Sequence, residues 1–293
     1  MATFERLDYT FHTLGEICAA DLYLPVSTAE GPWPAVITGP GFAGVKEMLI
    51  PSYAQSLATA GIACLSVDFI GFGASGGTIR QDIKPFDQIQ TLRDGLACLE
   101  NDDRFDSKRL GVWGTSLGGA HSLVIAAEEQ ERIKAAVALI PHISVATPGV
   151  MERVGLGIPI VRDLFWRTLG YAPATMAVTG ESGERAVMTT DGAVEWIGQV
   201  TKEAPRYRNE VTLASLLQMV GYNTKGYARR VRCPLLAICA VDDGITPASR
   251  IHDAMDGMAN VEFVDFEGSH FGLFGESLGE TVRLTTEFLK KHL

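Results

Sequence analysis

The sequence has few cysteines and no pattern that would pair them. Its five cysteines are odd in number, lie in apolar runs and include no C-x-x-C spacing, which indicates reduced core thiols. The six histidines include no close pair such as H-x-x-x-H, so the sequence favours no metal centre. No Walker motif is present either, and we expect no organic cofactor.

Positive charge and long apolar runs are also scarce. Lysine and arginine total 25 against 35 aspartates and glutamates, and the net charge of -10 argues against nucleic acid or an anionic membrane as partner. No uncharged apolar run is long enough to cross a bilayer. The first residues lack the basic and apolar regions of an export signal. We therefore expect a cytoplasmic protein that acts on a small molecule.

Alternating strand and helix patterns predict an α/β fold. The chain opens with an antiparallel pair of strands at residues 4–11 and 16–24. Further strands are expected near residues 35–39, 62–68, 109–114 and 134–140, and helices near residues 47–60, 85–101 and 117–128. This alternation predicts a mostly parallel, doubly wound sheet with helices on both faces.

The alternation stops after residue 143. Residues 144–231 contain helical patterns and no buried strand run, so we expect a helical insertion, or lid, on a core formed by residues 1–143 and 232–293. Apolar residues of the insertion and the preceding loop would line a substrate pocket. The candidates for this lining are His142, Trp166, Trp196 and Met219. The sequence leaves open whether the insertion also pairs two chains in a homodimer.

A G-x-S-x-G pattern at Gly114 to Gly118 follows an apolar run and precedes a helix-like stretch. A serine on a sharp strand-to-helix turn has a strained backbone and tolerates no bulky neighbours, which accounts for the two glycines. Such a turn would expose the Ser116 hydroxyl and put the backbone N–H of Leu117 at a helix N-terminus, where it can donate to an oxyanion. Ser116 is therefore the candidate nucleophile.

An acid and a histidine follow Ser116 in the order that this turn requires. The apolar run 235–241 ends in a loop that contains Asp242 and Asp243, and the strand-like run 261–266 leads into a loop that contains His270. Serine needs a neutral imidazole to accept its proton, and a carboxylate must fix the imidazole tautomer. We expect His270 as the base and Asp243 as the acid, with Asp242 as the alternative.

These motifs resemble the α/β-hydrolase family over nearly the whole chain. Val36 to Gly44 occupies the place of the family's strand and oxyanion loop, although Gly39-Pro40 stands where many members have a histidine before the glycine. The resemblance implies that the backbone N–H of Phe42 is the second oxyanion donor. Asp68 to Ser75 is similar to the family's Asp-x-Arg-Gly-x-Gly-x-Ser, with Ile70 in place of the arginine.

A narrower resemblance is carried by Gly39 to Phe42 and by Val45 to Pro51. These segments are similar to the dienelactone-hydrolase-like branch, which includes fungal polyketide transferases and thiohydrolases. That branch implies an acyl chain carried as an ester or thioester and either water or an alcohol as acceptor. Lys46 and Glu47 have a simpler alternative explanation as a solvated charge pair where a helix begins.

The sequence therefore predicts a serine hydrolase that cleaves an ester or thioester of a small to medium hydrophobic substrate through an acyl-enzyme on Ser116. An acyltransferase remains an alternative. So does a carbon–carbon bond hydrolase in which His121, His142 or Thr147 holds a second oxygen, although we interpret the two histidines as wall or packing residues. The intact serine, aspartate and histidine disfavour a non-catalytic binding protein.

Overall fold

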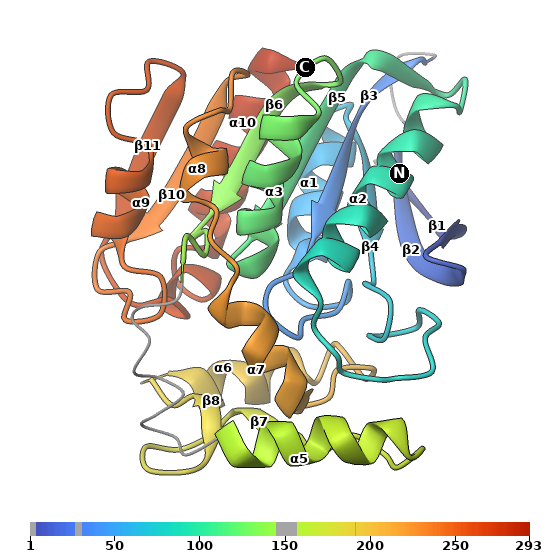
Figure 1. Cartoon of the computed structure of the whole chain (residues 1–293). Helices are drawn as coiled ribbons and strands as arrows, with labels where there is room; N and C mark the ends of the chain where they lie inside the picture. The colour runs from blue at the N-terminus through green and yellow to red at the C-terminus, as the bar shows by residue number, and fades with distance from the viewer. Residues whose placement is uncertain (1–3, 27–30, 145–156, 191) are drawn as a thin grey trace.

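The computed structural model describes residues 4–26, 31–144, 157–190 and 192–293 of the chain. The centre of the molecule is an eight-stranded β-sheet (Figure 1). Its strands, in spatial order, are β1 (Phe4–Thr13), β2 (Glu16–Pro25), β4 (Ala63–Val67), β3 (Trp33–Gly39), β5 (Phe105–Thr115), β6 (Ile133–Leu139), β10 (Leu235–Ala240) and β11 (Val261–Phe266). β2 is antiparallel to both neighbours, and the strands from β4 to β11 are parallel. The predicted mostly parallel sheet is confirmed.

Helices cover both faces of this sheet (Figure 1). On one face α1 (Ile50–Thr59) packs against α10 (Leu278–His292). The other face carries α2 (Pro85–Glu100), α3 (Leu117–Glu128), α8 (Lys225–Ala228) and α9 (Ala248–Ala254). Among the residues that the structure describes, no helix combines the length and the apolar composition that a bilayer crossing requires.

The central strands and α3 are buried because layers cover them on both sides. Every residue of β4 is buried, and in β3 only Trp33 is partly exposed. Such strands appear in the sequence as continuous apolar runs, as expected for a parallel sheet between two helical layers. α3 is buried from Leu117 to Ala127, since it packs on β5, β6, α2 and α8. The packing of these neighbouring elements therefore restricts the position of the turn from β5 into α3.

The insertion lies at the carboxyl ends of the parallel strands (Figure 1). Its described elements are α5 (Gly157–Thr168), β7 (Thr175–Thr179), β8 (Ala186–Met188), α6 (Ala193–Val200), β9 (Val211–Thr212) and α7 (Leu213–Val220). The helices agree with the sequence pattern, but β8, β7 and β9 form a small sheet that the sequence did not predict. These strands have only two to five residues each, which is too short for an apolar run that would mark them in the sequence.

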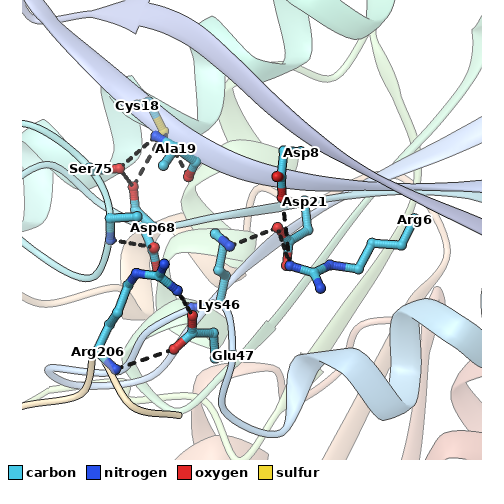
Figure 2. A network of polar contacts seen from close by, with 11 residues as sticks. Arg6, Asp8, Cys18, Ala19, Asp21, Lys46, Glu47, Asp68, Ser75 and Arg206 are labelled. Atoms are coloured by element: carbon cyan, nitrogen blue, oxygen red, sulfur yellow. Dashed lines mark hydrogen bonds and ion pairs between the residues drawn. The ribbon is translucent and has the colours of Figure 1, made fainter.

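A buried ion-pair network joins the antiparallel edge of the sheet to the loop after β3 (Figure 2). Lys46 Nζ lies 2.7 Å from Asp21 Oδ1, and the two side chains are only 6% and 2% exposed. Arg6 contacts the same carboxylate at 3.0 Å. The Lys46 backbone N–H donates to Asp68 Oδ1 at 2.7 Å. The explanation of Lys46 as half of a solvated charge pair is therefore wrong, because two buried acids hold this residue in place.

We predict that Lys46→Met lowers the free energy of unfolding by about 3 kcal/mol or more, because Asp21 would keep a buried charge without its main partner. Urea unfolding of the two proteins measures this difference. Lys84→Met is the matched control, since the Lys84 side chain is 51% exposed and its ion pairs are long. The control should change stability by less than about 1 kcal/mol. Equal losses in the two variants would contradict the prediction.

Candidate active site

Ser116 occupies the turn between β5 and α3 with a strained backbone. Its φ is 53° and its ψ is -114°, a region that residues other than glycine rarely adopt and that costs about 1–3 kcal/mol. Hydrogen bonds hold the turn: the Ser116 N–H donates to the Leu139 carbonyl at 2.9 Å, and the Ser116 carbonyl accepts from His142 N–H at 3.0 Å. The strain at Ser116 is thus maintained by the end of the neighbouring strand β6 and the loop that follows it.

The two glycines beside Ser116 are required by close backbone contacts. A Cβ at Gly114 would lie 2.1 Å from the Gly118 carbonyl oxygen. A Cβ at Gly118 would lie 2.1 Å from the Gly39 carbonyl oxygen, at the end of β3. No side chain fits at either position without moving backbone. The G-x-S-x-G spacing therefore reflects how tightly β5, α3 and the loop after β3 approach one another.

Asp243 and His270 come together from the loops after β10 and β11. His270 Nδ1 lies 2.6 Å from Asp243 Oδ2, with side chains that are 5% and 0% exposed. Asp243 Oδ1 also accepts from the backbone N–H groups of Ile245 and Thr246 at 2.7 Å, and Oδ2 accepts from the Thr246 hydroxyl at 2.7 Å. A carboxylate only accepts, so Nδ1 is the donor in this contact, and in the neutral form of the ring Nε2 is the nitrogen with the free lone pair.

The surroundings of Asp243 keep it ionised. Burial opposes its charge, but the hydrogen bonds from His270 and Thr246 outweigh burial and hold the pKa of Asp243 below its usual value. Asp242, the alternative acid, is exposed, and its backbone N–H donates to the Gly268 carbonyl at 3.0 Å. Of the two neighbouring aspartates, Asp243 is therefore the one that orients His270.

Ser116 and His270 line the same narrow cavity, which has a volume of about 50 Å³. The walls come from the loop after β3, from the insertion and from the segment that follows His270. The other lining residues are Pro40, Gly41, Phe42, Gly44, Met48, Leu49, Thr115, Val178, Met188, Trp196, Ile197, Tyr207, Phe271 and Phe274. No Asp, Glu, Lys or Arg is among these lining residues. The cavity that holds the serine and the histidine is therefore mainly apolar.

Two backbone N–H groups are candidates for binding an oxyanion beside Ser116. Leu117 is the first residue of α3, so its N–H has no acceptor within the helix and lies at the positive end of the helix dipole. Phe42 lines the cavity from the loop after β3. That loop is shaped by a turn in which Gly44 N–H donates to the Gly41 carbonyl at 3.0 Å. Lys46 then anchors it to Asp68.

Of the four predicted lining residues, Trp196 lines the cavity and three lie elsewhere. Trp166 of α5 lines a separate open hollow of about 550 Å³ on the insertion, together with Tyr171. Met219 is 8% exposed and packs in the core. His142 faces a smaller cavity beside Thr246, and burial lowers its pKa to about 4. Apolar character alone did not distinguish these positions, because it marks core and pocket equally.

His121 is a packing residue. Its Nδ1 lies 2.7 Å from the Tyr222 hydroxyl and its Nε2 lies 2.8 Å from Gln88 Oε1, and burial lowers its pKa to about 3. The imidazole is therefore neutral and joins α3 to α2 and to the end of the insertion. Thr147, the remaining candidate for a second-oxygen site, lies outside the described residues.

The sequence patterns did not identify several residues of the site. Thr246 contacts both Asp243 and His270, and the only signal for it was its position three residues after the acid. Phe271 follows His270 directly and Phe274 lies four residues after it, so their lining role had a local signal. Met188 and Tyr207 had none, since they reach the cavity only through the fold of the insertion.

Three potential metal ligands outside the cavity also come together among the described residues. Cys239, His252 and Asp265 have ligand atoms within 4.8 Å of one another, on β10, α9 and β11. His252 Nε2 lies 2.9 Å from Asp265 Oδ1, an ordinary hydrogen-bond distance. Burial raises the pKa of the Cys239 thiol well above its usual value, so this thiol is protonated when no metal ion is bound. The hydrogen bond between His252 and Asp265 therefore accounts for the proximity of these side chains.

We predict that Gly118→Ala lowers the free energy of unfolding by about 3 kcal/mol or more, because the new Cβ meets backbone oxygens that belong to a second segment. Denaturant unfolding measures the change. Gly279→Ala in α10 is the control, since nothing lies within 4 Å of the point that a Cβ would occupy there, and alanine favours a helix. A Gly118→Ala protein as stable as this control would refute the close-contact account.

Known proteins resemble the chain over most of its length. The family described as "alpha/beta hydrolase fold" matches residues 34–277. The quorum-quenching protein AidA of Acinetobacter baumannii (strain MDR-ZJ06) is 26% identical, over 97% of this chain and 94% of that protein. The thiohydrolase apmlB of Arthrinium phaeospermum is 30% identical, over 78% and 77% of the two chains. The polyketide transferase grgF of Penicillium sp is 33% identical over 62% and 60%.

A solved structure, that of DcsB in complex with its substrate analogue, superposes with a TM-score of 0.85 at 26% identity and covers 99% of both chains. The predicted resemblance to fungal thiohydrolases and polyketide transferases is confirmed. The sheet, the turn at Ser116 and the match over residues 34–277 lead to one conclusion. The chain belongs to the α/β-hydrolase family.

Proposed function

We propose that this hydrolase cleaves a carboxylic ester or thioester of a small to medium hydrophobic substrate through an acyl-enzyme on Ser116. One observation carries the proposal: a strained serine shares a narrow apolar cavity with a histidine that a buried aspartate orients. This is the combination that acyl transfer by serine needs, namely a nucleophile, a neutral base and a fixed tautomer.

In the first step the Ser116 hydroxyl attacks the acyl carbonyl while His270 Nε2 accepts its proton. Asp243 stabilises the imidazolium that forms, and its lowered pKa keeps it available as an anion. The Phe42 and Leu117 amides bind the tetrahedral oxyanion, a role in which one donor contributes on the order of 3 kcal/mol in other serine hydrolases. His270 then protonates the leaving alcohol or thiol.

In the second step His270 activates water, which releases the acid and restores Ser116. If an alcohol enters the cavity in place of water, the same residues perform acyl transfer. The relatives named thiohydrolase and polyketide transferase support an acyl substrate for both outcomes. No contact in the described residues favours carbon–carbon bond cleavage, because His121 is occupied by Tyr222 and Gln88, and His142 lies outside the cavity.

We also propose that the insertion moves as a lid. The cavity volume of about 50 Å³ is far below the 300–1,000 Å³ that is usual for ligand pockets, so a medium-length acyl chain requires one wall to shift. The insertion supplies Val178, Met188 and Tyr207 to that wall. Arg206, next to Tyr207, pairs with Glu47 of the loop after β3 (Figure 2). This ion pair links the two walls of the cavity.

The first test uses fluorophosphonate labelling and p-nitrophenyl esters of several chain lengths. We predict labelling at Ser116 in the wild type, and neither labelling nor turnover in Ser116→Ala. Asp243→Asn should lower kcat on the order of 10³–10⁴-fold, because the amide no longer fixes the tautomer. Asp242→Asn is the matched control and should keep wild-type turnover, since Asp242 is exposed. Labelling at another residue would sink the proposal.

The second test concerns the lid. Arg206→Gln should raise kcat/KM for long-chain esters up to about fivefold and leave acetate esters unchanged, because a partly exposed ion pair contributes up to about 1 kcal/mol to the closed form. Arg208→Gln is the control, since the Arg208 side chain is 58% exposed and pairs within the insertion. A change that is the same for every chain length would exclude a role in opening.

A further inference from the structure

Two buried polar groups of the cavity have no hydrogen-bond partner in the part of the chain that the structure describes. Among the described residues, Trp196 Nε1 and Thr115 Oγ1 are unpartnered side-chain atoms that belong to residues lining the cavity of Ser116 and His270. A buried donor or acceptor left without a partner costs about 1–3 kcal/mol. Native proteins satisfy most such groups, so each exception calls for an explanation. At a ligand cavity, the substrate itself is a natural partner.

The Trp196 ring is held in place by its neighbours. Its centroid lies 5.2 Å from that of Phe271 and 5.2 Å from that of Phe274, with interplanar angles of 31° and 42°. These contacts engage the apolar surface of the indole and offer its N–H no acceptor. Because both phenylalanines follow His270 in the chain, these contacts place the indole of α6 close to the catalytic histidine when the insertion is closed.

We propose that Trp196 Nε1–H is a hydrogen-bonding subsite for a substrate oxygen other than the scissile carbonyl. This inference rests on the proposed function and names its substrate class: esters or thioesters whose acyl chain carries a keto, ether, hydroxyl or amide oxygen. An acceptor oxygen satisfies the buried N–H, whereas a plain hydrocarbon chain leaves it unpaired. Sites built around such a hydrogen bond discriminate strongly against analogues that lack the partner group.

Trp113 provides an internal comparison. Its Nε1 is also buried and has no partner among the residues in Figure 1 that are not drawn in grey, but Trp113 is fully buried and packs on Tyr53 at a centroid distance of 4.5 Å. It does not line the cavity. A ligand in the cavity can therefore contact Trp196 but not Trp113. Trp113 is thus the matched control for the removal of an indole N–H.

The test compares p-nitrophenyl octanoate with analogues in which one methylene of the acyl chain, at positions 3 to 6, is replaced by an ether oxygen or a carbonyl. The wild type should prefer at least one oxygen-bearing analogue. Trp196→Phe should lower kcat/KM for that analogue about tenfold more than it lowers kcat/KM for octanoate, because both esters lose the same ring contacts and only the analogue also loses a hydrogen bond. Trp113→Phe, checked for folding by its thermal melt, should keep the wild-type preference.

Binding provides a second readout that needs no catalysis. Ser116→Ala and the Ser116→Ala, Trp196→Phe double variant are titrated by calorimetry with methyl octanoate and its oxygen-bearing analogues. We expect tighter binding of one analogue only when Trp196 is present. Equal losses for all ligands, or no loss for any, would overturn the subsite. An absence of ester turnover and of fluorophosphonate labelling in the wild type would instead reject the proposed function, while the titration still tests the subsite.

Discussion

The whole site relies on the tight approach of three backbone segments at the end of β5. Gly114 and Gly118 allow the strand, α3 and the loop after β3 to lie closer together than a side chain at either position would permit. Ser116 at the centre of this contact takes a φ of 53°, and the surrounding hydrogen bonds maintain the strain. This contact brings together the serine hydroxyl, the start of α3 and the loop that contains Phe42.

The second determinant is the way in which parallel strands end at one edge of the sheet. β5, β10 and β11 deliver Ser116, Asp243 and His270 to the same edge, although these residues are far apart in the sequence. The insertion covers this edge and contributes apolar side chains to a narrow cavity. In such surroundings charges and hydrogen bonds act strongly, which favours an oriented histidine and makes an unpaired indole N–H costly.

The ion-pair network connects the sheet and the loop after β3 with the insertion that covers the strand ends. Lys46 is held by Asp21 and by Asp68, so the loop after β3 is fixed from the core side. The next residue, Glu47, reaches outward to Arg206 of the insertion. Adjacent residues therefore join one wall of the cavity to the rigid sheet and to the proposed lid. Because the inner pair is buried and the outer pair is partly exposed, the inner contact is the stronger anchor.

Local patterns in the chain were enough to predict the core elements and the order of the candidate serine, acid and histidine. These patterns are apolar runs for buried strands, helical periodicity, and glycines around a serine at a turn. The choice between Asp242 and Asp243 needed the folded protein, because it depends on which carboxylate meets His270 across two loops. Folding also buried Lys46, added the small sheet of the insertion, and separated Trp196 from Trp166 and Met219. These outcomes depend on contacts between residues distant in the chain, which an apolar or charged side chain does not reveal on its own.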